Sequence, residues 1–369
     1  MDSPSYEITN DLNNWTNISV SPHDTHINIG YLLCISLLLC IVILVTVIGN
    51  VLVLAAIIRE INLQTLSNHL VFSLAVADLL VALLVMPLGA QYEVLGNHWI
   101  LGPTLCEVWT FVDVMCCTSS ILHLVAIAVD RYRAVTSVDY VQQRNCRKVF
   151  MMIGVVWGMG FLVSFGPVLG WKDEKFLERI HVEGRCLVSQ DAGYQIFATC
   201  SSFYVPLVAI LALYWRIWRV VRKRIRRRTG FIRPVAPPLL VCETSLIGSS
   251  NLNSSVASKK SRLEQKREVR AAKTLVIITG VFVACWLPFF AGALLTALCP
   301  SWQPPDSLFS LFLWLGYLNS TLNPVIYTMF SPDFRKAFAK MVLGNRRNQV
   351  VVSKSVTKLP CVYSADTVF

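Results

Sequence analysis

The third apolar stretch of the chain, which begins near Cys106, carries ionisable residues at both of its ends. Asp113 lies seven residues after Cys106, and an Asp-Arg-Tyr triplet, Asp130 to Tyr132, stands at the far end. The two aspartates are separated by about 25 Å along a helix. A charge buried in lipid costs at least about 3 kcal/mol, so such residues mark a binding site or a switch. We therefore expect a helix with a binding end and a signalling end.

Two further groups of side chains are spaced to hold an organic cation. Trp286, Phe289 and Phe290 point to one side of a helix, and aromatic faces attract cations and stack on aromatic rings. Thr199 and Ser202, at i and i+3, present two hydroxyls to one face. The alternative for the aromatic residues is core packing, but packing alone would not explain the uncompensated charge of Asp113. Together these residues predict a site for an ammonium group attached to a ring that bears a hydrogen-bonding group.

A second set of polar residues is distributed over four apolar stretches. A buried carboxylate without partners is too costly to serve only as a contact between helices, although polar groups in this setting often do just that. We expect them to form one polar cluster around a carboxylate, with room for water or a sodium ion: Asn50, Asp78, Ser120, Asn319 and Asn323.

The composition indicates which elements position these residues. Of the 369 residues, 54% are hydrophobic and 15% are charged, whereas soluble domains carry about 25% charged residues. Seven apolar segments are each long enough to cross a bilayer as a helix. They lie near Tyr31–Ile58, Asn68–Ala90, Pro103–Thr136, Arg147–Gly170, Gly193–Arg222, Val269–Leu298 and Pro305–Phe330. The expected fold is an all-α bundle of seven transmembrane helices over residues 31–330.

The basic residues predict the orientation. Alternate connections hold 29 and 4 of the 33 lysines and arginines, which places the N-terminus outside and the C-terminus inside the plasma membrane. The basic residues behind the net charge of +11 then form a cytoplasmic rim that faces the membrane. The sequence shows no basic stripe interleaved with exposed aromatic residues, which is the pattern that would suggest nucleic-acid binding.

The segments outside the bundle have distinct compositions. Residues 1–30 form a polar outer tail, expected to be disordered, with glycosylation sequons at Asn14 and Asn17. Residues 219–268 form a cytoplasmic loop with basic ends, which either only stop membrane transfer or also contact an intracellular partner. Residues 331–343 are expected to form a short amphipathic helix parallel to the membrane, followed by a cytoplasmic tail at 344–369. The last residue, Phe369, ends a tripeptide that fits a PDZ-type partner.

Three of the twelve cysteines are expected on the outer side of the membrane, and the others fall within or beneath the apolar segments. Cys106 with Cys186 would join the top of the third helix to the loop after the fourth, and Cys299 is left without a partner.

Motifs at matching places in the apolar segments identify the chain as similar to rhodopsin-like G protein-coupled receptors, from about Leu33 to Val342. These motifs are Gly49-Asn50-Val51, Leu74 to Asp78, Asp130-Arg131-Tyr132, Trp157, Pro206 with Tyr214, Cys285-Trp286-Leu287-Pro288 and Asn323-Pro324-Val325-Ile326-Tyr327. Asp113, Phe289-Phe290 and Trp314 to Tyr317 narrow the resemblance to the aminergic receptors. The stretches Asp113 to Ala126, Gly170 to Asp173 and Ser189 to Cys200 most resemble invertebrate serotonin type-1-like receptors.

The resemblance implies a role for each group of residues. The monoamine site would comprise Asp113, Val114, Cys117, Thr118, Leu187, Thr199, Ser202, Trp286, Phe289, Phe290 and Tyr317, with Tyr317 holding the rotamer of Asp113. The switch that meets a heterotrimeric G protein, of the inhibitory class that lowers cAMP, would comprise Asp130, Arg131, Tyr132, Tyr214, Glu268, Asn323, Pro324 and Tyr327. Arrestin and receptor kinases are further expected partners. No cofactor is expected other than an allosteric sodium ion near Asp78.

Several alternatives are weighed against this interpretation. A transporter should show internal repeats and paired broken helices, which the sequence lacks. No zinc-ligand spacing, nucleophile motif or carboxylate dyad indicates an enzyme. Catecholamine receptors generally carry serine at the position of Ala198, so its presence here favours an indoleamine such as serotonin. Octopamine and tyramine stay open as the alternative ligands.

Overall fold

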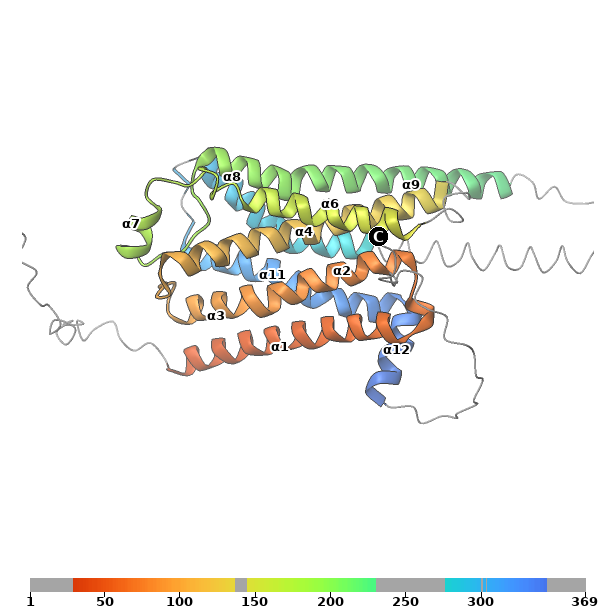
Figure 1. Ribbon diagram of the computed structural model, residues 1–369, viewed down its shortest axis with the longest axis horizontal. Helices are drawn as coiled ribbons and strands as arrows, with labels where there is room; N and C mark the ends of the chain where they lie inside the picture. The colour runs from red at the N-terminus through yellow and green to blue at the C-terminus, as the bar shows by residue number, and fades with distance from the viewer. Residues whose placement is uncertain (1–28, 137–144, 230–275, 300, 303, 344–369) are drawn as a thin grey trace, which may run out of the picture.

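The long helices of the described residues run along one axis and form a bundle (Figure 1). The computed structural model describes residues 29–136, 145–229, 276–299, 301–302 and 304–343. The first membrane helix is α1 (Ile29–Arg59). The second is a continuous run of α2 (Leu66–Leu80), η3 (Val81–Val85) and α3 (Met86–Val94), and the third is α4 (Gly102–Thr136). The next are α6 (Cys146–Ser164), the run α8 (Ala192–Thr199), η4 (Cys200–Tyr204) and α9 (Val205–Thr229), then Val276–Leu298, and α11 (Asp306–Phe330). A 3-10 turn, η2 (Ile61–Leu63), follows α1. No strand occurs in these described ranges.

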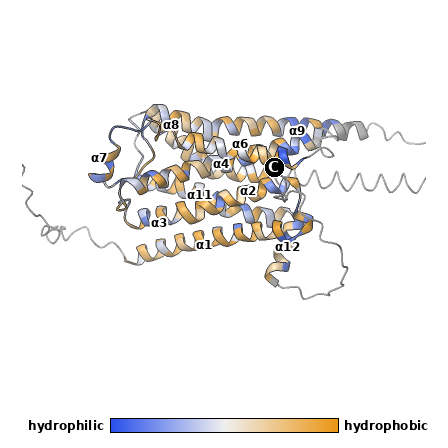
Figure 2. Cartoon of the chain, viewed as in Figure 1, coloured by the Kyte–Doolittle hydropathy of each residue, from blue (hydrophilic) through white to orange (hydrophobic). Residues whose placement is uncertain are grey.

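The outer surface of the bundle is apolar along its length, and hydrophilic residues gather toward the two ends (Figure 2). Six helical runs within the described chain are long and apolar enough to cross a membrane. The seventh helix, α11, is less apolar because its inward side carries Asn319, Ser320 and Asn323, all of them buried. The expected all-α, seven-helix fold is confirmed.

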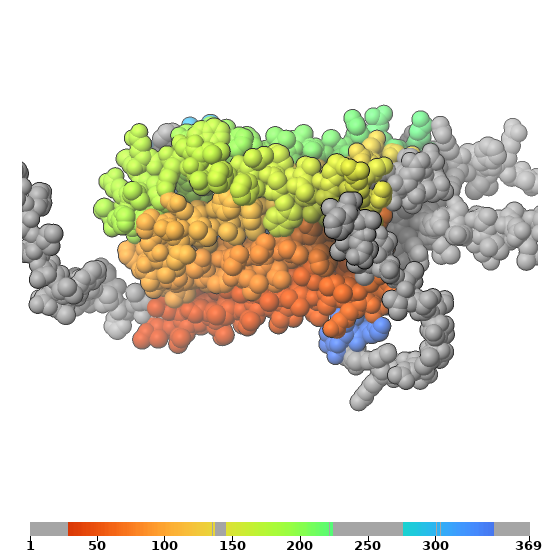
Figure 3. Space-filling model, viewed as in Figure 1, coloured from red at the N-terminus to blue at the C-terminus, as the bar shows by residue number. Residues whose placement is uncertain are grey.

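The helix α4 lies at the centre of the bundle and packs against α2, α6 and α9, while α1 packs against α2 and α11. The side chains of α1, α2 and α6 close one face of the molecule (Figure 3). Close approach requires small residues at some crossings: a Cβ atom at Gly49 would lie 3.0 Å from Cγ of Pro324. A Cβ atom at Gly160 of α6 would collide with Ser119 Oγ of α4.

A buried hydrogen-bonded chain joins α2, α4 and α6. The indole of Trp157 donates to Ser73 Oγ at 3.0 Å, and Ser73 Oγ lies 2.8 Å from Nε2 of His123. His123 Nδ1 lies 2.7 Å from the Ser119 carbonyl oxygen, which can only accept. Nδ1 therefore carries a proton, which leaves Nε2 to pair with the Ser73 hydroxyl. His123 thus acts as a structural residue that joins helices, as its isolation in the sequence indicates.

Two π-helical turns interrupt the membrane helices, and each of them ends two residues before a proline. The turn η3 ends at Val85, ahead of Pro87, and η4 ends at Tyr204, ahead of Pro206. Proline has no N–H to bond the carbonyl four residues back, so the helix widens locally to accommodate it.

The fourth membrane helix is shorter than expected. Helix α6 ends at Ser164, and Phe165 to Gly170 form turns, so Pro167 lies after the helix and not within it. The expected span of Arg147–Gly170 is wrong at its C-terminal end, because a proline restricts the residue before it away from helical conformation. The loop that follows contains a short helix, α7 (Phe176–His181), which was not predicted.

The last described helix, α12 (Pro332–Leu343), lies across the bundle axis (Figure 1). Phe334 and Ala337 are buried, and the Phe334 ring stacks on Tyr327 at a centroid distance of 5.4 Å. Lys340 binds Glu60 at 2.8 Å, which joins α12 to the end of α1. This placement agrees with the expected amphipathic helix at 331–343.

Candidate functional site

A cavity of about 690 Å³ opens between α4, η4, the helix Val276–Leu298, α11 and the loop after α6. Such a volume suits a small organic molecule. Ten of the eleven residues expected at the monoamine site line it: Asp113, Val114, Cys117, Thr118, Leu187, Thr199, Ser202, Trp286, Phe289 and Phe290. Residues more than 170 positions apart are therefore gathered around one cavity.

The carboxylate of Asp113 is the one acidic group of α4 that lines this cavity. Cys117, one turn further along α4, donates its thiol to Asp113 Oδ1 at 3.3 Å. No basic side chain of the described residues forms an ion pair with Asp113. A carboxylate in this position can form a charge-assisted hydrogen bond with a ligand's ammonium group.

Tyr317 does not reach the cavity, contrary to its expected place in the ligand site. Its ring is fully buried behind the wall, edge-on to Trp286 and to Trp314. Its hydroxyl lies beside Asp113 but forms no hydrogen bond of ordinary geometry. Tyr317 therefore supports the carboxylate from behind.

Aromatic rings form the inner wall opposite Asp113. Phe289 lies edge-on to Trp286 at a centroid distance of 5.8 Å, and the centroid of the Phe290 ring lies 5.7 Å from that of Trp286. Phe290 also stacks on Phe203 of η4 at 4.7 Å, which connects two helices through one aromatic cluster. Edge-to-face and offset contacts of this kind stabilise the wall and leave ring faces available to a ligand.

The hydroxyl pair of this wall comes from two helices. Ser202 Oγ lies 2.7 Å from Thr118 Oγ1. Ser202 stands in the π-turn η4, four residues before Pro206, so its own carbonyl is the one that the proline cannot bond. The expectation assumed regular i and i+3 spacing from Thr199. The widened turn was not predicted, yet Thr199 and Ser202 both line the cavity.

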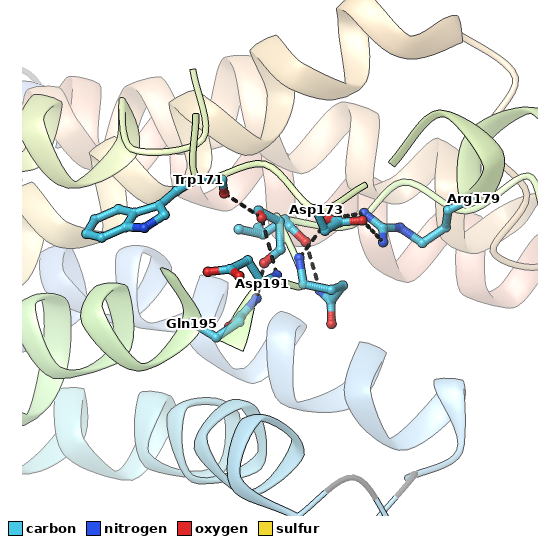
Figure 4. A network of polar contacts seen from close by, with 8 residues as sticks. Trp171, Asp173, Arg179, Asp191 and Gln195 are labelled. Carbon is cyan, nitrogen blue, oxygen red and sulfur yellow. Dashed lines mark hydrogen bonds and ion pairs between the residues drawn. The ribbon is translucent and has the colours of Figure 1, made fainter. Parts of the chain in front are cut away.

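The loop after α6 covers the outer end of the cavity and is held by several polar contacts (Figure 4). Cys106 and Cys186 form a disulfide with a Cα–Cα distance of 5.7 Å, which sets the neighbouring Leu187 over the cavity. Arg179 binds Asp173 through two hydrogen bonds of 2.9 and 3.0 Å. Arg185 pairs with Asp306 at the start of α11 and so bridges the cavity mouth.

Asp173 is the centre of the loop contacts. It also accepts the backbone N–H of Gln190 at 2.9 Å. Partial burial acts to raise the pKa of this carboxyl, but the hydrogen bonds from Arg179 and Gln190 outweigh it and hold the pKa below its usual value.

Several residues on the cavity wall were missed by the sequence analysis. They are Gly89, Tyr92, Trp109, Arg185, Asp306, Phe309, Leu313 and Trp314. Trp109 lies one helical turn before Asp113, a spacing that could have found it. Arg185 and Asp306 meet only through the loop's three-dimensional course, for which the sequence offers no signal.

The expected polar cluster is present beneath the cavity. Asp78 accepts hydrogen bonds from Ser320 Oγ and Asn323 Nδ2, both at 2.8 Å, and is fully buried. Asn50 Nδ2 donates to the Ser320 carbonyl at 3.1 Å. Within this cluster, four buried oxygens have no hydrogen-bond partner in the described structure: those of the Asn50, Asn319 and Asn323 amides and of Ser120. Buried acceptors without donors suit a hard cation, which prefers oxygen ligands.

At the opposite end of α4, Asp130 accepts from Ser67 Oγ at 2.8 Å and lies 3.5 Å from the guanidinium of Arg131. Tyr214 bonds to Thr279 at 2.6 Å and thereby joins α9 to the helix Val276–Leu298. Tyr132 and Pro324 lie on α4 and α11 as expected. Glu268, Asn14 and Asn17 lie outside the described residues.

Comparison with known proteins identifies the class to which this fold and site belong. The family model of the seven-transmembrane receptors of the rhodopsin family matches residues 49–327. The chain belongs to this family. It is therefore a G protein-coupled receptor, a multi-pass protein of the plasma membrane with a small-molecule ligand and a G protein as partners, and it is not an enzyme.

Individual relatives narrow the class to aminergic receptors. The chain is 47% identical to a 5-hydroxytryptamine receptor of Heliothis virescens, with 82% of each chain covered. It is 46% identical to a 5-hydroxytryptamine receptor of Bombyx mori, with 81% of each covered. It is 34% identical to the 5-hydroxytryptamine receptor 1A of Xenopus laevis, over 85% of this chain and 92% of the relative.

Proposed function

We propose that this receptor binds serotonin and signals through an inhibitory G protein to lower cAMP. The observation that carries the proposal is the position of Asp113, a carboxylate without a basic partner among the described residues, on the wall of a cavity that also presents aromatic rings and two hydroxyls. The names of the relatives from Heliothis virescens and Bombyx mori support the choice of ligand.

The proposed ligand pose follows from the chemistry of the wall. The ammonium group binds Asp113, and the indole ring lies against Trp286, Phe289 and Phe290. The ring hydroxyl or indole N–H reaches the pair formed by Thr118 and Ser202, or Thr199 beside it. Ala198, also on the wall, offers no hydroxyl to a second ring oxygen, which disfavours catecholamines.

The orientation and further partners belong to the same proposal. The proposed orientation has the N-terminus outside and the C-terminus in the cytoplasm, and the uneven distribution of the 33 lysines and arginines supports it. Arrestin, receptor kinases and a PDZ-type protein at Phe369 are proposed as additional cytoplasmic partners. We also propose that a sodium ion binds near Asp78, where the oxygens of Ser120, Asn50 and Asn319 lack donors.

The experiment that tests the function is a cAMP assay in cells with serotonin, octopamine, tyramine and dopamine at matched doses. The intact receptor is compared with Asp113→Asn, which keeps the shape of the side chain but removes its charge. We expect serotonin to lower stimulated cAMP at the lowest dose, and the variant to lose the response. A response led by octopamine or tyramine would replace the ligand, and a serotonin response that survives Asp113→Asn would place the amine elsewhere.

A further inference from the structure

The side of α9 that faces away from the bundle carries two stacked tryptophans. The ring centroids of Trp215 and Trp218 lie 5.2 Å apart with an interplanar angle of 29°. Both side chains are open to the surroundings, at 59% and 48% exposure. The guanidinium carbon of Arg222 lies 4.8 Å from the centroid of the Trp218 ring. These residues form one stripe along the helix, at i, i+3 and i+7.

This stripe lies where the membrane helix passes into its basic end. The apolar run that includes α9 extends to Val220, and the exposed residues Arg216, Arg219, Arg222 and Lys223 begin within its last turns. The opposite side of α9 is engaged by the bundle, because Ile210 and Ile217 are buried and Tyr214 bonds to Thr279. The tryptophan stripe therefore faces the lipid at the level of the head groups.

We propose that an anionic phospholipid of the cytoplasmic leaflet binds to this stripe. Trp215 and Trp218 would hold the glycerol region and upper acyl chains, since tryptophan prefers the boundary between hydrocarbon and water. Arg219 and Arg222 would bind the phosphate, for which the planar guanidinium has the right donor geometry. The inference rests on the orientation proposed above, because anionic lipids are concentrated in the cytoplasmic leaflet.

Two observations favour an anionic lipid over other occupants. Among the described residues, none of the ion pairs involves Arg219 or Arg222, so their donors are available to a phosphate. A second copy of the chain that used the same stripe would bring two sets of these arginines together, and this repulsion disfavours a dimer.

The test uses the full chain purified in mild detergent and the fluorescence of its tryptophans. Brominated phosphatidylglycerol, which is anionic, and brominated phosphatidylcholine, which is zwitterionic, are titrated as quenchers. Because the chain has ten tryptophans, the signal of the stripe is obtained by difference from Trp215→Phe/Trp218→Phe. We expect the anionic lipid to reach half-quenching at a concentration at least about tenfold lower than the zwitterionic one, because two arginine contacts allow a preference of up to about 30-fold.

Two charge variants separate a site from general surface charge. Arg219→Gln/Arg222→Gln should abolish the tenfold preference for the anionic lipid. The matched control, Arg335→Gln/Lys336→Gln, removes the same charge from exposed residues of α12 and should keep that preference. Ligand binding by each variant shows that it is folded. Equal quenching by the two lipids, an equal loss of preference in the control, or quenching unchanged by the tryptophan substitutions would each overturn the proposal.

Discussion

The indole of Trp286 packs directly on the backbone of Gly316. A Cβ atom at position 316 would lie 2.6 Å from Cζ3 of that ring, closer than any real contact allows. Trp286 also touches Phe289, Phe290 and Tyr317, so the glycine of α11 sets the depth at which the aromatic wall stands. The position of the ligand cavity floor thus depends on the absence of a single methyl group.

Gly316→Ala should therefore displace Trp286 and weaken ligand binding. Overpacking of this kind costs about 1–3 kcal/mol, which corresponds to a loss of affinity of roughly 5- to 150-fold. Radioligand displacement on membranes measures it. Gly280→Ala, in the same helix as Trp286, is the control, because a Cβ there meets nothing within 4 Å. If both alanine variants bind the ligand equally well, Gly316 does not set the cavity floor.

The pair formed by Thr118 and Ser202 should contribute to stability as well as to ligand recognition. Ser202→Ala leaves the buried Thr118 hydroxyl without the partner that lies 2.7 Å away, at a cost of about 1–3 kcal/mol. Thr118→Val/Ser202→Ala removes both hydroxyls together. In the absence of ligand, the fall in its melting temperature should therefore be smaller than the sum of the falls in the two single variants. Thermal unfolding of the purified receptor checks this. Strictly additive losses would show that the two hydroxyls act independently.

Ser73 should be more sensitive than an ordinary buried serine, because its single hydroxyl serves both Trp157 and His123. Ser73→Ala would leave an indole N–H and an imidazole nitrogen unpaired, and each unpaired group costs about 1–3 kcal/mol. Ser73→Thr, which keeps the hydroxyl, is the matched control. Thermal unfolding should show a large loss for alanine and a small one for threonine. Similar losses for both would mean that volume, and not hydrogen bonding, decides at this position.

Much of the fold followed from the sequence because each membrane helix is a local feature of about 20 apolar residues. Errors arose where backbone geometry depends on proline. Pro167 ends α6 early, and Pro206 widens η4, yet the sequence alone shows both only as prolines near apolar stretches. The π-turn before Pro206 is what places Ser202 beside Thr118, a contact between residues 84 positions apart.

The chemical groups of the candidate site could be predicted from the sequence, but the set of residues that line the cavity was harder to predict. A carboxylate such as Asp113 is rare enough in an apolar helix to identify itself. The resemblance to aminergic receptors assigned Tyr317 to the ligand site, but its ring packs edge-on against Trp286 and Trp314, away from the cavity wall. The outer rim depends on the loop after α6, whose course is fixed by the contacts of Asp173 and by the disulfide of Cys186.

The loop should lose stability in acid through Asp173. Its folded pKa lies below the value in the unfolded chain, so its contribution is present at neutral pH and is lost as the pH falls below about 4. Asp173→Asn should lower the thermal stability of the purified receptor at pH 6. Between pH 6 and pH 3.5 the variant should then lose less stability than the intact receptor, because it has no carboxylate at position 173 to protonate. Asp191→Asn in the same loop is the comparison. An unchanged acid profile in Asp173→Asn would exclude this carboxylate as the cause.

Sodium should stabilise the receptor through Asp78. A cation near this carboxylate would satisfy the oxygens of Asn319 and Ser120, which have no donor in the described structure. Binding to the folded state alone adds about 1.4 kcal/mol at ten times the dissociation constant. The purified receptor should therefore melt at a higher temperature in sodium chloride than in choline chloride of equal ionic strength. Asp78→Asn should remove that difference, because the amide supplies no charge. Ser120→Ala should reduce it, because one oxygen is lost but the carboxylate remains. Asp173→Asn, which removes an acidic group far from the cluster, should keep the full difference. A sodium effect that persists in Asp78→Asn would show that the ion binds elsewhere, and that the unpaired oxygens of the cluster are satisfied by water.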